Sequence, residues 1–259
     1  MKEISSRDNA WYKELKQLAS SATARRKAGR TLLDGSHLCQ MYLAHCGQPL
    51  HCVVNQDSQH HPEIAALMQS CCEQTILLPD ALYQAVSPVD HGLGVLFVIP
   101  TPIMTLPDGF VLEQNALLLD QVQDPGNFGS ILRSAAAAGI KQVFCSPGTA
   151  AAWSPKVLRS GMGAQFLLTI FEAVNLSDLI QNSQIPVLAT SSHASQTLYD
   201  LDLQQQVAWL FGHEGQGVSV DLIRQATHQI AIPHATSMES LNVGACAAVC
   251  FFEQLRQNR

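Results

Sequence analysis

The sequence lacks the features that define several large protein classes. No stretch of it approaches the roughly 18 consecutive apolar residues that a membrane-spanning helix needs. Its first residues, MKEISSRDNAWYKELKQ, contain no apolar core of a secretion signal. The eight cysteines form no C-x-x-C pair, which favours reduced thiols over a disulfide framework. We therefore expect a cytoplasmic protein without a membrane partner.

Fingerprints of three common enzyme classes are missing as well. The chain contains no G-x-G-x-x-G dinucleotide motif, no G-x-x-x-x-G-K-[ST] phosphate loop and no G-x-S-x-G nucleophile motif. Histidines and cysteines gather between residues 37 and 72, but their order fits no zinc module. Core cysteines and surface histidines explain this cluster better, so we expect no bound metal.

Charge is scarce and unevenly placed. Charged residues make up 14% of the chain. Residues 1–30 hold eight Lys or Arg against three Asp or Glu, whereas the remainder holds seven against eighteen. A basic arm on an acidic body indicates a polyanionic partner that contacts mainly the N-terminal part. A solvated amphipathic helix explains the same charges equally well.

Strand and helix patterns alternate along the whole chain. The later strands are continuously apolar, as in ALLLD, which is typical of a buried parallel sheet in an α/β domain. Three prolines between residues 100 and 110 indicate a linker, so we expect domains at 1–100 and 113–259 joined by a linker at 101–112. The expected strands are 30–35, 51–55, 75–79, 93–100, 115–122, 142–146, 166–172, 186–191, 206–212 and 229–233, and the expected helices are 8–20, 36–45, 61–71, 129–139, 154–161, 176–183, 219–228 and 243–252.

The first of three notable strand-to-loop junctions is DPGNFG at residues 124–129. Its proline and glycines predict a sharp turn directly before a helix, and the free N–H groups of a helix start suit a phosphate. Arg133 follows in that helix. In this motif alone, an ordinary surface arginine is the simpler interpretation.

The other two junctions lie nearer the C-terminus. FGHEGQG, residues 211–217, places glycines where the backbone can approach a ligand closely, although an ordinary glycine-rich turn fits equally well. Glu214 within it could pair with an arginine or accept from a ribose hydroxyl. In PHATSMESLNVGACAAVCFF, residues 233–252, Ser240 and Asn242 stand where a polar loop meets an apolar helix.

Taken together, these motifs resemble those of a known enzyme family. DPGNFGSILRSAAAAG, FGHEGQG and IPHATSMESLNVGACAAVCFFE are similar in kind, order and separation to the three motifs of the SpoU (TrmH-like) branch of the SPOUT RNA methyltransferases. The resemblance covers about residues 113–257. It implies a C-terminal SPOUT domain with a parallel sheet and a deep trefoil knot, preceded by a small ribosomal-protein-like α/β domain that binds the RNA substrate. Periodicity alone could not indicate a knot.

The resemblance also implies an activity. Members transfer a methyl group from S-adenosylmethionine to a ribose 2′-hydroxyl of structured RNA, and they are usually homodimers joined through the C-terminal helix. Ribosomal RNA is favoured over transfer RNA by the separate N-terminal domain. The alternatives are a transfer RNA methyltransferase and a non-catalytic RNA-binding protein. Position by position, the cofactor residues would be Thr190, Gly212, Ile232 and Leu241, and the catalytic residues Arg133, Asn127, Glu214, Ser240 and Asn242.

Three further points follow from the match. An ordinary arginine is a poor base, so Arg133 is either an activated base or a clamp on the neighbouring phosphate. His213 stands where many members have Asn, and we expect it to act through its backbone. Ser160 in RSGMGA is out of register with the serine of the family and is left out of the site.

Overall fold

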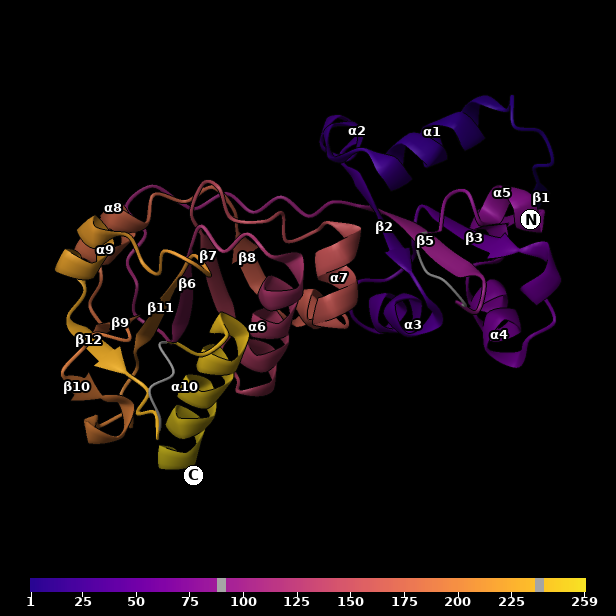
Figure 1. The fold of residues 1–259 in the computed structure, drawn as a ribbon. Helices are drawn as coiled ribbons and strands as arrows, with labels where there is room; N and C mark the ends of the chain where they lie inside the picture. Colours follow the sequence, from indigo (N-terminus) through magenta and orange to yellow (C-terminus); the bar gives the residue numbers. More distant parts are fainter. Residues whose placement is uncertain (88–91, 236–239) are drawn as a thin grey trace. The chain divides into compact units, whose positions relative to one another are not determined.

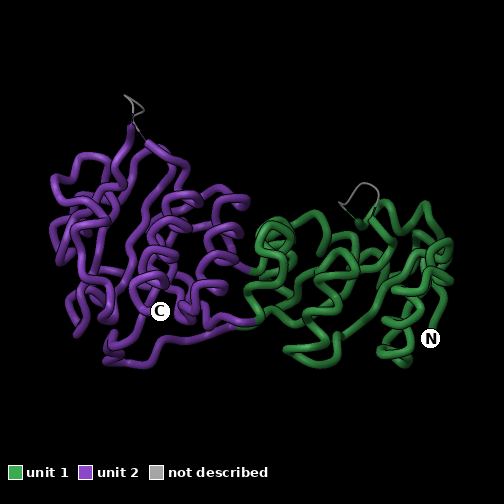
Figure 2. The backbone as a smooth tube through the Cα atoms, turned by 90° about the horizontal axis from the view of Figure 1, so that it is seen from below, with its two compact units in different colours: residues 1–102, 153–166 green, residues 103–152, 167–259 purple. Residues whose placement is uncertain are grey.

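The chain forms two compact units, described by a computed structural model over residues 1–87, 92–235 and 240–259 (Figures 1 and 2). Unit 1 comprises Met1–Pro102 and Trp153–Phe166, and unit 2 comprises Ile103–Ala152 and Leu167–Arg259. The chain therefore passes between the units three times. Nothing in the sequence pattern indicates that residues 153–166 pack with the N-terminal part, and the expected domain ranges stay a prediction.

Unit 1 is built on a five-stranded mixed sheet in the order β1-β4-β3-β5-β2. Strand β5 runs antiparallel to β2 and β3, whereas β4 runs parallel to β1 and β3. The strands are β1 (Lys2–Glu3), β2 (Arg30–Asp34), β3 (His51–Asn55), β4 (Thr75–Leu78) and β5 (Val95–Pro100). The helices are α1 (Ala10–Ser20), α2 (Ala22–Ala28), α3 (Ser36–His45), α4 (Pro62–Ser70), α5 (Asp80–Tyr83) and α7 (Pro155–Gly161), with 3-10 turns η1 (Gln56–Ser58) and η2 (Cys72–Gln74).

Helix α1 shows why these residues fold as they do. Asn9 caps the helix by accepting from the Tyr12 N–H at 3.2 Å. Tyr12, Leu15 and Leu18 recur at helical spacing and are buried in a core cluster with β-strand residues such as Val53. The expected helix over 8–20 is thus confirmed, with its first turn beginning at Ala10.

The segment 153–166 is attached to unit 1 by specific contacts. The Thr31 hydroxyl on β2 donates to the Trp153 carbonyl at 2.6 Å. Phe166 packs edge-on against Tyr42 of α3, with ring centroids 5.5 Å apart. Ser154 caps α7 by accepting from the Val157 N–H, as its position in the sequence predicts.

Unit 2 is a seven-stranded, entirely parallel sheet in the order β10-β12-β9-β11-β6-β7-β8. The parallel α/β architecture expected for this part of the chain is confirmed, whereas the trefoil knot stays a prediction. The strands are β6 (Ala116–Asp120), β7 (Gln142–Cys145), β8 (Thr169–Phe171), β9 (Val187–Thr190), β10 (Gln196–Thr197), β11 (Ala208–Gly212) and β12 (His228–Ala231). The helices are α6 (Pro125–Ala137), α8 (Leu176–Gln181), α9 (Val220–Gln225) and α10 (Val243–Gln257), with the 3-10 turn η4 (Leu198–Asp200). The 3-10 turn η3 (Ala164–Leu167) spans the point where the chain leaves unit 1 for unit 2.

Helices cover both faces of this sheet. Helices α6 and α10 lie side by side (Figure 1), and Phe251 of α10 packs edge-on against Phe211 of β11. On the other face, Leu179 of α8 and Leu222 of α9 join a core cluster with Leu210 of β11. All eight cysteines are free thiols. None of the helices in the described part of the chain has the length and apolar character to cross a bilayer.

The structure corrects two expected elements. The predicted turn over residues 124–129 is wrong, because α6 already begins at Pro125. Asp124 is its N-cap and accepts from the Asn127 N–H at 2.8 Å, and a proline at the first helical position is favourable. Of the expected strand 166–172, only residues Thr169–Phe171 form a strand, which is β8. Part of the third junction, residues 236–239, lies outside the described residues.

Asp34 gives unit 1 a testable pH dependence. Burial raises the pKa of Asp34 from its ordinary 3.8 to about 6, against the opposing effects of the Ser87 hydroxyl at 2.7 Å and of Arg159. The protonated form is therefore favoured in the fold. The contribution of Asp34 to the free energy of unfolding is fully present below pH 3.8 and decreases as the pH rises through 6. Above that pH, the free energy of unfolding is lower by up to about 3 kcal/mol.

We expect Asp34→Asn to increase the free energy of unfolding more at pH 7.5 than at pH 4.5, because Asn is neutral at both. Chemical denaturation at the two pH values measures the difference. Asp57→Asn, at an exposed site in the same unit, is the matched control and should change little. An equal gain at both pH values would contradict the assignment.

Candidate functional site

The carboxyl ends of neighbouring parallel strands in unit 2 carry the loops of the site. Strands β6 and β11 are paired in register, with Gly212 opposite Asp120. Strand β9 pairs with β11 on its other side and with β12 beyond. The loops that follow these strands therefore leave the same edge of the sheet, which is where ligands bind in open parallel sheets.

Glu214 joins the loop after β11 to the start of α6. One carboxylate oxygen, Oε1, accepts from the Asp124 N–H at 3.0 Å and from Asn127 Nδ2 at 3.1 Å. The other, Oε2, accepts from the Gln123 N–H at 3.2 Å. The orphan donors at the N-terminal end of a helix thus find an anionic partner from another loop.

These hydrogen bonds keep Glu214 ionised. Burial alone would raise the pKa of Glu214. Hydrogen bonds from its own backbone, from Asn127 and from the N–H groups of Asp124 and Gln123 outweigh burial and lower that pKa below its usual value. A carboxylate held in this way is an anchor for the loops rather than an acceptor of a proton from a substrate.

Asn127 extends the connection to the third loop. Its Oδ1 accepts from Asn242 Nδ2 at 2.8 Å. Asn242 is in turn the N-cap of α10, and its Oδ1 accepts from the N–H groups of Gly244 at 2.9 Å and Ala245 at 3.3 Å. Three loops that are far apart in the sequence are therefore linked by one chain of side-chain hydrogen bonds.

Gly212 allows the backbone to fold tightly after β11. A Cβ at this position would lie 2.1 Å from both the Gly217 carbonyl carbon and the Val218 nitrogen. No other residue type fits there without opening the turn. The buried carboxylate of Asp120 supports the far end of the same loop, because it accepts from the Ser219 N–H at 2.9 Å and from the Ser146 hydroxyl at 3.3 Å.

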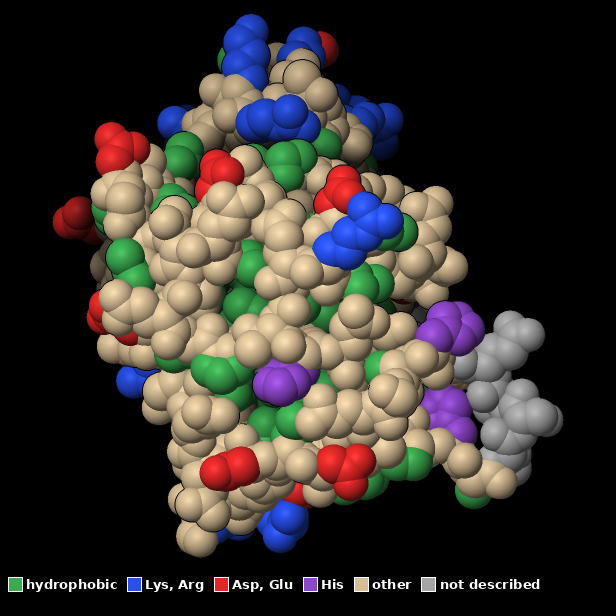
Figure 3. All heavy atoms as spheres, turned by 90° about the vertical axis from the view of Figure 1, so that its left-hand side faces the viewer, with side chains coloured by type: hydrophobic (Ala, Val, Ile, Leu, Met, Phe, Trp, Pro, Cys, Tyr) green, Lys and Arg blue, Asp and Glu red, His purple; other side chains and the backbone are tan. Residues whose placement is uncertain are grey.

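A cavity of about 840 Å³ lies beside this loop. It brings together all four residues expected to bind the cofactor, and the expected catalytic residues Glu214 and Ser240. Its apolar wall includes Val218, Ile223, Ile230, Val243 and Cys246. Histidines 193, 213 and 234 also line it. Figure 3 shows histidine side chains exposed on one face of the molecule.

Arg133 lies apart from this cavity. It is exposed on α6, two turns from the helix start, and does not line the cavity. Among the described residues it makes no hydrogen bond or ion pair within the chain. The structure therefore brings together eight of the predicted site residues, with Asn242 joined to Glu214 through Asn127, and leaves the guanidinium of Arg133 available to a partner.

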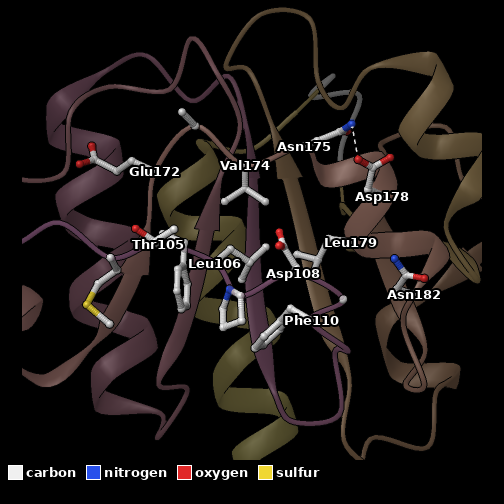
Figure 4. A pocket seen from close by; sticks show the side chains of 15 residues that line it. Thr105, Leu106, Asp108, Phe110, Glu172, Val174, Asn175, Asp178, Leu179 and Asn182 are labelled. Atoms are coloured by element: carbon white, nitrogen blue, oxygen red, sulfur yellow. Dashed lines mark hydrogen bonds between the residues drawn. The ribbon is translucent and has the colours of Figure 1, made fainter.

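A second cavity, of about 500 Å³, lies beside β8, the edge strand on the opposite side of the sheet from β10 (Figure 4). Its walls come from residues 104–110 and from the segment 171–182 that contains α8. Carboxylates of Asp108, Glu172 and Asp178 line it, and Asn175 donates to Asp178 at 2.7 Å. The negative charge makes it unsuitable for phosphate, and it holds none of the predicted site residues.

Two functional side chains escaped the sequence-based prediction. Asp120 could have been noticed as a lone carboxylate at the end of an apolar strand. The expectation that His213 acts only through its backbone was incomplete. Its carbonyl does accept from the Gly217 N–H at 2.8 Å, but its ring Nδ1 also accepts from the N–H groups of Gly215 and Gln216.

Comparisons with known proteins agree with this geometry. Residues 114–252 match the model of the SpoU rRNA Methylase family. An uncharacterized tRNA/rRNA methyltransferase of Synechocystis is 33% identical over 98% of this chain and 93% of its own length. The 23S rRNA (guanosine(2553)-2′-O)-methyltransferase RlmP of Bacillus subtilis is 27% identical over 97% of this chain and 98% of its own length.

The fold is likewise that of solved relatives. A crystal structure of an RNA 2′-O ribose methyltransferase superposes with a TM-score of 0.84 at 28% sequence identity. The superposition covers 98% of this chain and 98% of that chain. The similarity therefore extends over both units and not only over the three motifs.

The crowding at Gly212 leads to a prediction. We expect Gly212→Ala to destabilise unit 2 by about 2 kcal/mol or more, because the methyl group must displace backbone atoms rather than a flexible side chain. Thermal unfolding of the purified protein measures the loss. Gly215→Ala is the matched control, since its Cβ would meet only the His213 ring at 3.7 Å. Equal stability of the two variants would show that the turn yields easily.

Proposed function

The chain belongs to the SpoU rRNA methylase family, and on that premise we propose that it transfers a methyl group from S-adenosylmethionine to a ribose 2′-hydroxyl of structured RNA. The observation that carries the proposal is the hydrogen-bonded chain from Glu214 through Asn127 to Asn242, which closes beside the cavity. The predicted cofactor residues line that cavity together with Glu214 and Ser240.

The cavity fits the cofactor in size and chemistry. Its volume lies within the range of about 300–1,000 Å³ that is usual for small-molecule sites. Ile232 and Leu241 offer apolar contacts to a purine, and Gly212 exposes backbone groups with no Cβ in the way. The Thr190 hydroxyl, at the end of β9, donates to the Leu210 carbonyl at 3.3 Å and so stiffens one wall.

The chain's own residues position the reactants. The sulfonium of the cofactor supplies an already activated methyl group, so the protein must chiefly align it with the ribose hydroxyl. Glu214, Asn127 and Asn242 hold the three loops in register, and Ser240 lies at the cavity wall where the ribose would approach. Arg133, free of partners among the described residues, is assigned as the clamp on the phosphate next to the target ribose.

The basic arm supports an RNA-binding role for unit 1. Three of its cations are already engaged. Arg25 donates to the Leu18 carbonyl at 2.7 Å, Arg30 pairs with Glu14 at 2.9 Å, and Lys13 pairs with Asp8 at 3.0 Å. Within the described part of the chain, the cations of the arm with neither an ion pair nor a side-chain hydrogen bond are Lys2, Arg7, Lys16, Arg26 and Lys27. These are the side chains that we assign to phosphate contacts.

We favour ribosomal RNA as the substrate, because the RlmP relative, which matches this chain over nearly its full length, is named for 23S rRNA. Transfer RNA is the second candidate, since the name of the Synechocystis relative covers both. The test is to map 2′-O-methylation in total RNA with and without the gene. Loss of a methyl mark from ribosomal RNA supports the proposal. Loss from transfer RNA alone would identify transfer RNA as the substrate in place of ribosomal RNA.

We also propose a homodimer in the cytoplasm, as the family resemblance implies. One face of α10 is buried in its own unit, where Gly244 lies against Ser130 of α6. The opposite face exposes Ala245 and Phe252, the latter 47% accessible, and so offers an apolar stripe to a second copy. Eight free thiols suit a reducing compartment.

Arg133 provides a direct test of the chemistry. We expect Arg133→Ala to lower kcat/KM for RNA at least about 100-fold, because the phosphate and the ribose hydroxyl lose their alignment. The Kd for S-adenosylhomocysteine and the melting temperature should not change, since Arg133 is exposed and outside the cavity. Arg224→Ala, another exposed arginine of unit 2, is the control. Near-normal turnover by Arg133→Ala would remove it from the mechanism.

The arm can be tested by charge reversal. We expect the double variant Arg26→Glu and Lys27→Glu to weaken RNA binding and to reduce the slope of log Kd against log salt by about 2. The matched control, Lys141→Glu with Arg224→Glu, changes the net charge equally on unit 2. Filter binding at several salt concentrations measures both. The same slope for both double variants would exclude a specific role for the arm.

A further inference from the structure

The loop between β11 and α9 contains a tight turn over residues 213–217 that forms part of the cavity wall. The Gly217 N–H donates to the His213 carbonyl at 2.8 Å and closes the turn. Inside it, His213 Nδ1 accepts from the Gly215 N–H at 3.0 Å and from the Gln216 N–H at 3.3 Å. Glu214, whose carboxylate holds the start of α6, lies within the same turn.

We propose that the His213 ring is a positioning residue that sets the shape of this turn and thereby both the cofactor wall and the direction of Glu214. The proposal rests on the proposed function for its effect on cofactor binding, but the claim about the turn stands on the geometry alone. His213 does not act on the substrate. It acts through the backbone of Gly215 and Gln216.

The hydrogen bonds define the state of the ring. Nδ1 receives two N–H donors, so it carries no proton, and a neutral imidazole must then hold its proton on Nε2. Within the described part of the chain, Nδ1 is the acceptor for both N–H groups. Without it, two adjacent amides of an exposed turn lose their partner within the chain and depend on water instead, which favours opening of the turn.

The ends of the loop are supported separately. At one end, Gly212 is paired in the sheet and has no room for a Cβ. At the other, the Asp120 carboxylate accepts from the Ser219 N–H at 2.9 Å. The middle of the loop depends on the His213 ring. Changes at His213 should therefore act locally, on the turn and on Glu214, without unfolding the sheet.

Side-chain length identifies which substitution restores the turn. Asn Oδ1 stands the same number of bonds from Cβ as His Nδ1, and Asn side chains commonly accept from the N–H two residues further on. Gln Oε1 is one bond further out, and Ala has no acceptor. His213→Asn should thus preserve the turn, whereas His213→Gln and His213→Ala should not.

The experiment compares these three variants with the wild-type protein and with His228→Asn, an exposed histidine on β12 that does not line the cavity. Hydrogen exchange of a peptide that spans residues 213–218 reports the turn. Calorimetric titration with S-adenosylhomocysteine reports the cavity. Melting temperatures confirm that each variant is folded.

We expect about tenfold faster exchange and about tenfold weaker binding for His213→Ala and His213→Gln. His213→Asn should stay within about threefold of wild type in both. The proposal is overturned if His213→Ala keeps wild-type protection, or if His213→Asn behaves like His213→Ala. If the wild-type protein binds no S-adenosylhomocysteine while the exchange pattern holds, the proposed function fails and the role of the ring stands.

Discussion

The site depends on one anionic side chain placed where a helix begins. Glu214 accepts from two backbone N–H groups ahead of α6 and from Asn127, and Asn127 accepts from the residue that caps α10. Each group in this series satisfies a donor from another part of the chain, so removal of one member leaves its neighbours to be hydrogen-bonded by water and no longer ties the loops together. The hydrogen-bonded series thus links residues that lie up to 115 positions apart in the sequence.

The parallel sheet makes that contact possible. Packing of its buried apolar strands aligns the carboxyl ends of β6 and β11, with Asp120 opposite Gly212. This alignment does not depend on the polar groups of the loops. Core packing therefore supplies the position and the loops supply the chemistry. Substitutions in the strands and substitutions in the loops should therefore have different effects. Substitutions in the strands change stability, whereas substitutions at Asn127 or Asn242 change the contacts between the loops.

Local patterns predicted much of the fold and part of the site. Continuous runs such as Leu117–Leu119 identified the buried strands, and Ser154 identified the start of a helix. The glycines after Pro125 suggested a turn, yet capping by Asp124 draws them into α6. The bonds of the His213 ring and of Asp120 depend on backbone geometry that no local pattern encodes. The site residues came from the family resemblance rather than from periodicity.

The packing of residues 153–166 with unit 1 has a consequence for folding during synthesis. Synthesis proceeds from the N-terminus, and domains generally fold as soon as their residues have emerged. Unit 1 is completed later than its first 102 residues emerge, because Thr31 and Tyr42 contact Trp153 and Phe166. Its β2 flank remains uncovered until β6, α6 and β7 have left the ribosome. The two units are thus completed together rather than one after the other, and a gene fragment that ends at Pro102 lacks the segment that packs against β2.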